Sequence, residues 1–228
     1  MNETEYVVVS DFDGTITLQD SNGLIVEILG NEENAKIEEA FIIGLAGNRE
    51  TLEKHFQTML ISLQEYKDFL DEHIRMDPDF DSFLGKIRVE KIPFFIVSAG
   101  FKQGIRHILG HDRVAETEIY ANDLVGEERL ITKFAMNNLP CTNEVGTCGN
   151  CKRMSIEEIR RKTDKKIIYI GDGMTDVCVV DGVDLLFAKD YLADYCESNQ
   201  IPYIPFKQFR DVEAYLTDKQ FFRKRRAS

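Results

Sequence analysis

The sequence is poor in positive charge and has no long run of apolar residues. Its 228 residues include 28 Lys and Arg against 40 Asp and Glu, which gives a formal net charge of −12. An acidic surface repels phosphate backbones, so we expect no nucleic-acid partner. The apolar runs fall far short of the roughly 20 residues that a membrane helix needs. The acidic start, from Met1 to Glu5, lacks the basic region of a secretion signal. We therefore expect a cytoplasmic protein with no membrane partner.

Cysteine is also scarce, and its number is odd. Five cysteines in a chain without an export signal argue against a disulfide framework. Cys141, Cys148 and Cys151 share an irregular loop, with the spacing C-x6-C-x2-C. A structural zinc site normally has four ligands, and no fourth Cys or His lies nearby in the sequence. We expect plain loop packing, and we leave structural zinc and a redox or disulfide role open as alternatives.

Short apolar runs recur along the chain, and most of them precede a helix-like stretch. They cover residues 6–10, 93–98, 167–170, 185–188 and 201–204. Runs of this kind are typical of parallel strands that are buried on both faces. With 43% hydrophobic and 30% charged residues, the composition is that of a globular protein. The alternation predicts an α/β fold with a Rossmann-like, doubly wound parallel sheet.

The segment 18–79 interrupts this alternation, because it shows helical periodicity and no convincing strand. Pro78 marks its end, since proline disfavours a helical conformation in the residue before it. We therefore predict an α/β core formed by residues 1–17 and 80–228, with a helical insert at 18–79 between the first two core strands. The apolar run from Phe41 to Leu45 is either core of this insert or an exposed patch.

Three of the predicted strands end in small or acidic residues. Asp11 and Asp13 follow the first strand, Ser98-Ala99-Gly100 ends the second, and the segment 171–176, with the sequence GDGMTD, follows the third. Ligands of open α/β sheets bind outside the carboxyl ends of the strands. We therefore expect these three segments to meet at one crevice.

Four carboxylates would gather at this crevice: Asp11, Asp13, Asp172 and Asp176. Asp11 and Asp13 are two residues apart, so they would project to one side if the strand continues that far. Like charges near a low-dielectric interior are costly unless a cation compensates them. Oxygen ligands favour a hard divalent ion, so the sequence predicts a Mg²⁺ site.

A phosphate group fits such a crevice. A metal held by two carboxylates keeps positions open for a phosphate oxygen, and Ser98 with nearby backbone N–H groups such as that of Ala99 can hold the other oxygens. Lys152, the nearest lysine after the irregular loop, adds positive charge. The reaction class is phosphoryl transfer to a carboxylate. Two nucleotide-binding signatures are missing, since there is no G-x-x-x-x-G-K-[ST] and Asp176 replaces the third glycine of G-x-G-x-x-G.

In these features the sequence resembles the haloacid dehalogenase-like phosphatases. The segment 11–15 (DFDGT), Ser98, Lys152 and the segment 171–176 are similar to the four motifs of that family, in the same order. The resemblance implies that Asp11 is the nucleophile that becomes an aspartyl-phosphate. It implies that Asp13 is the general acid and base and that Ser98 and Lys152 hold phosphate oxygens. The role of Asp13 also follows from chemistry, because rapid hydrolysis of a phosphoenzyme needs a proton carrier beside the nucleophile.

The resemblance also implies a ligand set for Mg²⁺. It comprises the side chains of Asp11 and Asp172 and the main-chain carbonyl of Asp13, while Asp176 orders the surroundings. The insert resembles the small helical cap of the phosphoserine-phosphatase-like branch, which closes over the site and selects the substrate.

We expect the substrate to be a small phosphorylated metabolite. The residues of the cap do not identify which one. Where phosphoserine phosphatases carry a Glu and an Arg that hold the amino acid, this chain has Asp20 and His55, so the bidentate carboxylate clamp of the Arg is missing. The segments 141–152 and 187–192 resemble methionine-salvage phosphatases acting on 2-hydroxy-3-keto-5-methylthiopentenyl-1-phosphate. The cysteine-rich loop and the GDG segment also occur in phosphoethanolamine and phosphocholine phosphatases. Two alternatives from other classes are a module that accepts a phosphoryl group as a signal and a phosphotransferase with an alcohol acceptor.

Overall fold

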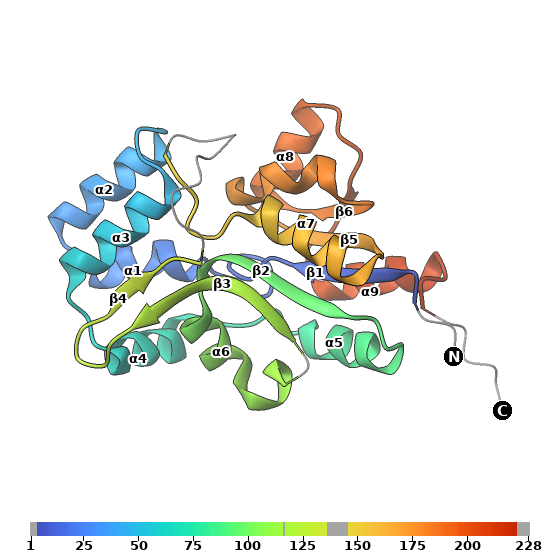
Figure 1. Ribbon diagram of the computed structural model, residues 1–228, viewed down its shortest axis with the longest axis horizontal. Coiled ribbons are helices and arrows are strands. Elements are labelled where there is room, and N and C mark those ends of the chain that lie inside the picture. Colours follow the sequence, from blue (N-terminus) through green and yellow to red (C-terminus); the bar gives the residue numbers. More distant parts are fainter. Residues whose placement is uncertain (1–3, 116, 136–145, 223–228) are drawn as a thin grey trace.

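A computed structural model describes residues 4–115, 117–135 and 146–222, and it confirms the doubly wound sheet. The strands in these ranges are β1 (Tyr6–Ser10), β2 (Phe94–Phe101), β3 (Glu118–Val125), β4 (Ile131–Lys133), β5 (Lys166–Gly171), β6 (Leu185–Ala188) and β7 (Ile204–Pro205). They form one sheet in the order β4-β3-β2-β1-β5-β6-β7 (Figure 1). Neighbouring strands are parallel except for β4, which pairs with β3 in the antiparallel direction.

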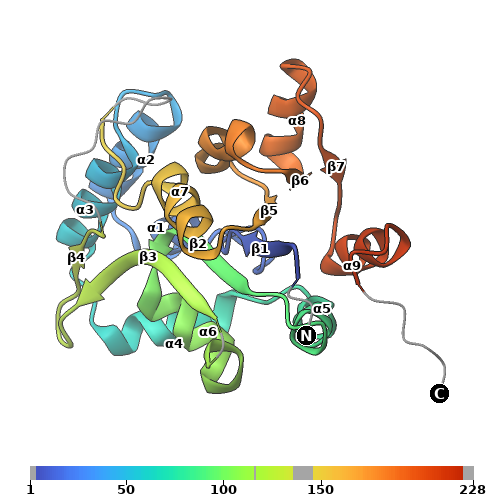
Figure 2. The ribbon, with the colours of Figure 1, turned by 45° about the vertical axis from the view of Figure 1, so that its right-hand side comes forward.

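Helices cover both faces of the sheet (Figure 2). The helices of one layer are α5 (Phe80–Val89), α6 (Lys102–Val114) and α9 (Phe209–Asp218). The other layer contains α7 (Lys152–Thr163), the 3-10 helix η1 (Met174–Gly182) and α8 (Asp190–Ser198). Val8 of β1 packs with the first layer, whereas Val7 and Val9 pack with the second. This double burial explains why the strand is a continuous apolar run.

Four helices precede α5 in the connection between β1 and β2, as the periodicity of the segment 18–79 predicts. They are α1 (Ser21–Leu29), α2 (Glu32–Ile42), α3 (Asn48–Met59) and α4 (Leu63–His73). An isolated bridge between Thr17 and Met76 closes the segment at its base. Buried residues of α1, α3 and α4 share an apolar cluster with Phe101, Leu124 and Leu130 of the sheet region. The division into a core and a cap at residues 18 and 79 stays a prediction.

The structure corrects three details of the sequence analysis. The run 201–204 contributes only Ile204 to a strand, β7. The sequence analysis missed β3 and β4, because β3 mixes polar and apolar residues without a regular alternation and β4 has only three residues. The run that begins at Phe41 is an exposed patch, since Ile42, Ile43 and Leu45 are 70%, 61% and 72% exposed.

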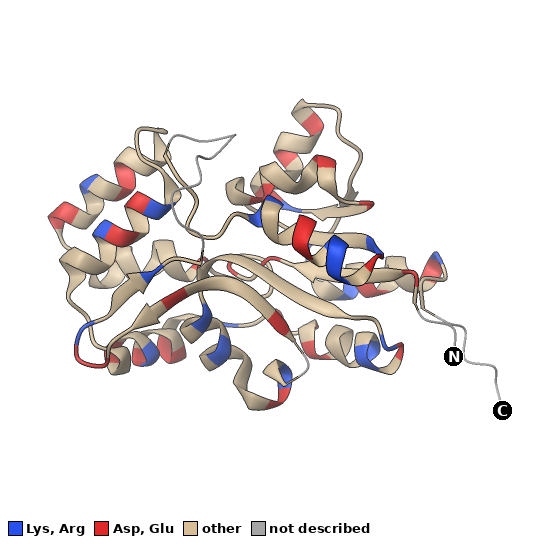
Figure 3. Cartoon of the chain, in the orientation of Figure 1, with Lys and Arg blue, Asp and Glu red and all other residues tan. Residues whose placement is uncertain are grey.

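Charged residues of both signs are spread over the helices of the described chain (Figure 3). In the described residues, no helix combines the length and the apolar character that crossing a bilayer requires. The sequence ends in a basic cluster, Arg223-Lys224-Arg225-Arg226, that we expect to be a solvated tail, and this cluster lies outside the described residues.

Candidate active site

Polar residues at the carboxyl ends of β1, β2 and β5 line one cavity, as the sequence predicts. The cavity has a volume of about 270 Å³ and extends from these strand ends to α2 and α3. The predicted site residues that line it are Asp11, Asp13, Asp20, His55, Ser98, Ala99 and Asp172. Lys152 and Asp176 are 2% and 0% exposed. Lys152 contacts the carboxylate of Asp11, and Asp176 accepts a hydrogen bond from the backbone N–H of Asp172. The structure thus brings all of the predicted residues to one place, and their chemical roles stay predictions.

Lys152, the first residue of α7, contacts two carboxylates at once. Its Nζ lies 2.7 Å from Oδ2 of Asp11 and 2.7 Å from Oδ1 of Asp176. Burial lowers the pKa of Lys152, but the charges of the two aspartates outweigh it and hold this pKa above its usual value. The other oxygen of Asp11, Oδ1, accepts a hydrogen bond of 2.7 Å from the backbone N–H of Phe12. Both oxygens of Asp11 are therefore held in place.

Both carboxylate oxygens of Asp176 have hydrogen-bond partners. Its Oδ1 also accepts from the hydroxyl of Tyr169 at 2.5 Å. Its Oδ2 accepts from the backbone N–H groups of Asp172 at 3.1 Å and Gly173 at 2.9 Å. Burial would raise the pKa of Asp176, but the charge and hydrogen bond of Lys152 and the other donors hold this pKa below its usual value. Asp176 is therefore an ionised carboxylate that fixes the turn after β5.

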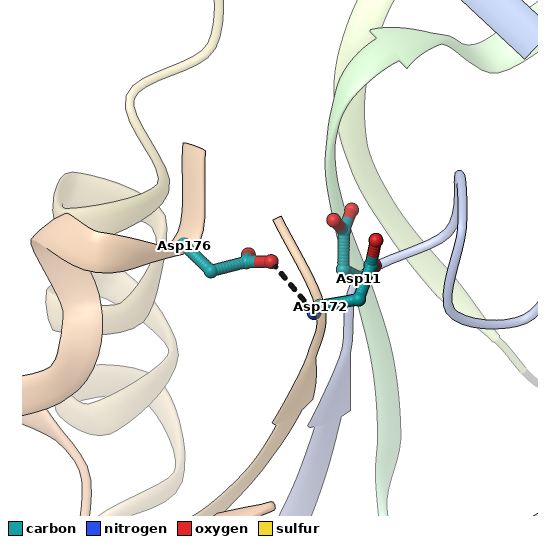
Figure 4. Close-up of side chains that lie close together, drawn as sticks. All are labelled: Asp11, Asp172 and Asp176. Atoms are coloured by element: carbon teal, nitrogen blue, oxygen red, sulfur yellow. Dashed lines mark hydrogen bonds between the residues drawn. The ribbon is translucent and has the colours of Figure 1, made fainter. Parts of the chain in front are cut away.

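Asp11 and Asp172 follow the neighbouring strands β1 and β5, and their carboxyl groups point the same way beyond the strand ends (Figure 4). One oxygen from each of Asp11, Asp172 and Asp176 lies within 4.8 Å of the others. Thr15 donates a hydrogen bond to Asp172. Burial, with the charge of Asp176, raises the pKa of Asp11 well above its usual value and that of Asp172 to about 7. Burial and the neighbouring carboxylates therefore disfavour the charged forms of Asp11 and Asp172 more than Lys152 favours them.

Asp13 lines the same cavity, but not because the strand continues through it as the sequence analysis considered. β1 ends at Ser10, and Asp13 lies in the turn that follows. Its Oδ1 accepts hydrogen bonds from the backbone N–H and the hydroxyl of Ser21, at 3.1 and 2.5 Å. Its Oδ2 accepts from Nδ2 of Asn22 at 3.2 Å. Burial, with the charge of Asp20, raises the pKa of Asp13 to about 6.

Two buried asparagines shape the segment that contains Ser98 and Ala99. Asn150 donates from Nδ2 to the carbonyl of Ser98 at 2.9 Å, and Asn122 donates to the carbonyl of Ala99 at 2.8 Å. The Ser98 hydroxyl accepts from the N–H of Gly100 at 2.9 Å. The sequence analysis did not identify either asparagine, because Asn122 lies in the missed strand β3 and Asn150 in an irregular loop.

The two predicted cap residues also have structural partners. Asp20 is the N-cap of α1, and its Oδ1 accepts from the N–H groups of Asn22 and Gly23 at 2.9 and 3.3 Å. His55 is 2% exposed, and its Nε2 lies 2.8 Å from Oε2 of Glu38, a residue that the sequence analysis did not identify. No sequence signal distinguishes Glu38 from the other glutamates of α2.

The cysteine loop gives no support to a zinc site. The side chains of Cys148 and Cys151 are hydrogen-bonded to each other, and Cys141 lies outside the described residues. In the part of the chain that the structure describes, the group of acidic, Cys or His side chains that could hold a metal ion is the aspartate group described above. The metal expectation therefore rests on that group.

Comparisons with known proteins agree with this geometry. Residues 6–194 match the model of the family described as Putative Phosphatase. The chain is 33% identical over 217 residues to the 2-hydroxy-3-keto-5-methylthiopentenyl-1-phosphate phosphatase of Brevibacillus brevis, with 94% of this chain and 96% of the relative covered. It is 29% identical over 227 residues to the polyol phosphate phosphatase PYP1 of Saccharomyces cerevisiae, with 92% of each covered. A solved phosphoserine phosphatase, bound to a phospho-aspartyl intermediate analogue, matches with a TM-score of 0.69 at 16% identity, over 94% of this chain and 99% of that chain.

Proposed function

Because this chain belongs to the Putative Phosphatase family and is a haloacid dehalogenase-like phosphoric monoester hydrolase, we propose that it hydrolyses a small phosphate ester through an aspartyl-phosphate on Asp11. The observation that supports this step most strongly is the pairing of Asp11. Phe12 and Lys152 fix its two oxygens, and the side chain lines the cavity. A nucleophile held in this way needs no reorganisation before it attacks phosphorus.

Asp13 completes the reaction in this proposal. When Asp11 attacks phosphorus, the bond between phosphorus and the leaving oxygen breaks, and Asp13 gives that oxygen its proton. Asp13 then takes a proton from water, which attacks the aspartyl-phosphate, releases inorganic phosphate and restores Asp11. The pKa of about 6 at Asp13 suits a group that must both give and take a proton near neutral pH. This role also favours hydrolysis over a long-lived phosphorylated signal.

The donor set fits a divalent cation. Four carboxylates gather here, and Lys152 contacts two of them, Asp11 and Asp176. We propose that Mg²⁺ binds the carboxylates of Asp11 and Asp172 and the main-chain carbonyl of Asp13, while Asp176 stays paired with Lys152. When bound, Mg²⁺ would neutralise charge on the phosphate oxygens during transfer.

For the substrate, we propose a small phosphorylated metabolite, with the methionine-salvage enol-phosphate named for the relative of Brevibacillus brevis as one candidate. The size of the cavity, about 270 Å³, fits such a compound. Phosphoserine is a weaker candidate, because no Lys or Arg among the described residues lines the cavity to bind its carboxylate. Phosphoethanolamine and phosphocholine remain alternatives.

The test uses p-nitrophenyl phosphate, with Mg²⁺ present or removed by EDTA. Asp11→Asn should abolish hydrolysis and leave the fold intact. The matched control is Asp194→Asn, which makes the same chemical change at an exposed position on α8 and should keep full activity. Full activity of Asp11→Asn would refute the proposal, and activity that persists without any divalent ion would refute its metal part. A panel of phosphoserine, phosphoethanolamine and the enol-phosphate then ranks the substrates.

A further inference from the structure

The cavity wall opposite the strand ends is formed by residues of α2 and α3, and we call three of its polar residues, Glu38, Thr51 and His55, the cap wall. Glu38 comes from α2, and Thr51 and His55 lie one turn apart on α3. All three line the cavity together with Asp11 and Asp13. The cap wall is therefore placed to contact the part of a phosphate ester that leaves as an alcohol.

A buried asparagine next to His55 determines which of its two ring nitrogens carries the proton. Asn34 is fully buried, its Oδ1 accepts from the N–H of Asn31 at 3.1 Å, and its Nδ2 donates to the hydroxyl of Thr58 at 2.6 Å. These partners fix the orientation of the amide, so the Nδ2 group that lies 3.2 Å from Nδ1 of His55 is a donor. Nδ1 is then the acceptor, and the ring proton is on Nε2.

Nε2 of His55 lies 2.8 Å from Oε2 of Glu38. The Nε2–H group therefore donates a hydrogen bond to the Glu38 carboxylate. Asn34 and His55 are thus positioning residues that hold one oxygen of the Glu38 carboxylate. Among the described residues, the second oxygen of Glu38 has no hydrogen-bond partner. The Glu38 side chain is 30% exposed, so this oxygen can accept a hydrogen bond from a ligand.

Thr51 adds an independent observation. Its residue is 3% exposed, and its Oγ1 is a buried polar atom with no partner within the described ranges. Buried hydroxyls in native proteins are nearly always hydrogen-bonded, because an unpaired one costs free energy. Since Thr51 lines the cavity, a ligand is the natural partner of its hydroxyl.

The charges of the wall limit what that ligand can be. Asp20 and Glu38 both bring carboxylates to the cavity, and no Lys or Arg of the described chain lines it. Burial raises the pKa of Asp20, and the charge of Glu38 raises it further. A carboxylate on the leaving group would be repelled here. An ammonium group could donate to Glu38 and to the oxygen of Thr51, but it would leave the O–H of Thr51 without an acceptor, whereas a hydroxyl group can donate to Glu38 and accept from Thr51.

We propose that the cap wall binds hydroxyl groups of the leaving alcohol, with Glu38 as acceptor and Thr51 as donor, so that the enzyme selects phosphate esters of uncharged, hydroxylated compounds. This inference rests on the proposed hydrolysis at the opposite end of the cavity. It identifies Glu38 and Thr51 as residues that determine specificity.

The test compares kcat/KM for glycerol 2-phosphate, which carries hydroxyls, with that for phosphoethanolamine and for p-nitrophenyl phosphate, which has no hydroxyl on its leaving group. Glu38→Ala and Thr51→Val should each lower kcat/KM for glycerol 2-phosphate about 10-fold more than for p-nitrophenyl phosphate, chiefly through KM. Glu39→Ala, at an exposed neighbour on α2, is the matched control. Thr51→Ser keeps the hydroxyl, so this variant, unlike Thr51→Val, should retain the wild-type preference for glycerol 2-phosphate.

Glu38→Gln separates the two kinds of donor, because glutamine keeps an acceptor oxygen and loses the charge. For a hydroxyl ligand the loss should be within about 5-fold, whereas an ammonium ligand would lose about 50-fold or more. A wild-type preference for phosphoethanolamine, together with this large loss, would overturn the proposal. Unchanged preferences in Glu38→Ala and Thr51→Val would also overturn it.

A binding measurement keeps this test separate from that of the catalytic proposal. Calorimetry with glycerol 2-phosphate in the Asp11→Asn background reports affinity without turnover. If Glu38→Ala weakens binding there by about 10-fold, the cap wall binds the alcohol whatever the role of Asp11. If the affinity does not change, the inference fails even where hydrolysis at Asp11 is established.

Discussion

The two ends of the cavity differ in how completely their polar groups are paired. At the strand ends, Asp11, Lys152 and Asp176 form a closed set of contacts in which each carboxylate oxygen has a partner. In the cap wall, the Thr51 hydroxyl and one oxygen of Glu38 have none among the described residues. Groups whose hydrogen bonds are all made within the protein are held in one geometry, which suits a fixed reaction. Polar groups without a partner in the protein can instead bind the substrate. We therefore propose that the strand ends define the chemistry and that the cap wall defines which ester is accepted.

The largest expected effect is that of Lys152→Met, which would break the closed set. Two carboxylates, Asp11 and Asp176, would lose their buried cation. Removing one partner of a buried ion pair costs about 3–5 kcal/mol of the free energy of unfolding. Hydrolysis of p-nitrophenyl phosphate should fall by about 10³-fold. Thermal denaturation and kcat measure the two effects.

The matched control is Lys162→Met on the same helix, because Lys162 is exposed and pairs with Glu118 at the surface. Its effect on stability should lie within about 1 kcal/mol. Equal melting temperatures for the two variants would show that the contacts of Lys152 do not hold the site together.

The next largest effect on activity should come from a steric clash. Gly14 has a φ of +74°, and a Cβ added there would lie 2.3 Å from Oδ2 of Asp172. Gly14→Ala should displace this carboxylate and lower kcat by about 10²-fold, with a higher Mg²⁺ concentration needed for half-maximal activity. Gly44→Ala is the control, since Gly44 has a φ of +73° and an added Cβ would meet nothing within 4 Å. Similar activity in both variants would mean that the position of Asp172 is unimportant.

Metal removal should make the stability of the protein depend on pH. The folded protein holds the pKa of Asp172 at about 7 and that of Asp13 at about 6, above the usual value of 3.8. The folded state therefore binds protons more tightly than the unfolded state, and this stabilisation is lost as pH rises through the folded pKa values. The melting temperature in EDTA should fall between pH 5 and pH 8, and Mg²⁺ should raise it more at pH 8.

Asp172→Asn provides the comparison, because it removes one of the carboxyl groups whose pKa is raised in the folded protein. Its melting temperature in EDTA should vary less with pH than that of the wild type. A wild-type slope that is equally steep in Asp172→Asn would contradict the assignment of this pH dependence to Asp172.

The smallest effect should come from the open end of the cavity. Thr51→Val replaces a hydroxyl that has no partner in the described chain, so the free energy of unfolding should stay the same or rise by up to about 1 kcal/mol. Thr15→Val makes the same change where the hydroxyl donates to Asp172, and it should cost about 1–3 kcal/mol. Chemical denaturation measures both variants. A marked destabilisation by Thr51→Val would show that its hydroxyl has a structural partner.

The sequence predicts the strand ends well, for a physical reason. Parallel strands β1, β2 and β5 are neighbours in the sheet. Asp11 and Asp172, just beyond the ends of β1 and β5, therefore meet Ser98, which lies in the C-terminal half of β2. The apolar runs that precede them are also easy to identify, because they are buried on both faces. This is why the fold class could be predicted and why the strand-end residues could be expected to lie together.

The cap wall could not be predicted in this way. Glu38 reaches His55 across 17 residues of sequence, and its helix is rich in other glutamates. Nothing in the sequence indicates that Thr51 is buried without a partner. β3 was missed because its exposed and buried positions are mixed, and Asn122, which holds the carbonyl of Ala99, was missed with it. Contacts between separate elements decide these positions, and local patterns do not reveal them.

The most direct test of the account is to find where the phosphoryl group is bound during turnover. Asp13→Asn should form the aspartyl-phosphate from p-nitrophenyl phosphate, whose leaving group needs no proton, and should hydrolyse it slowly. The protein is quenched in acid during turnover, digested and analysed by mass spectrometry. We predict one added phosphoryl group, on Asp11. A phosphoryl group on another residue, or none while turnover continues, would contradict the account.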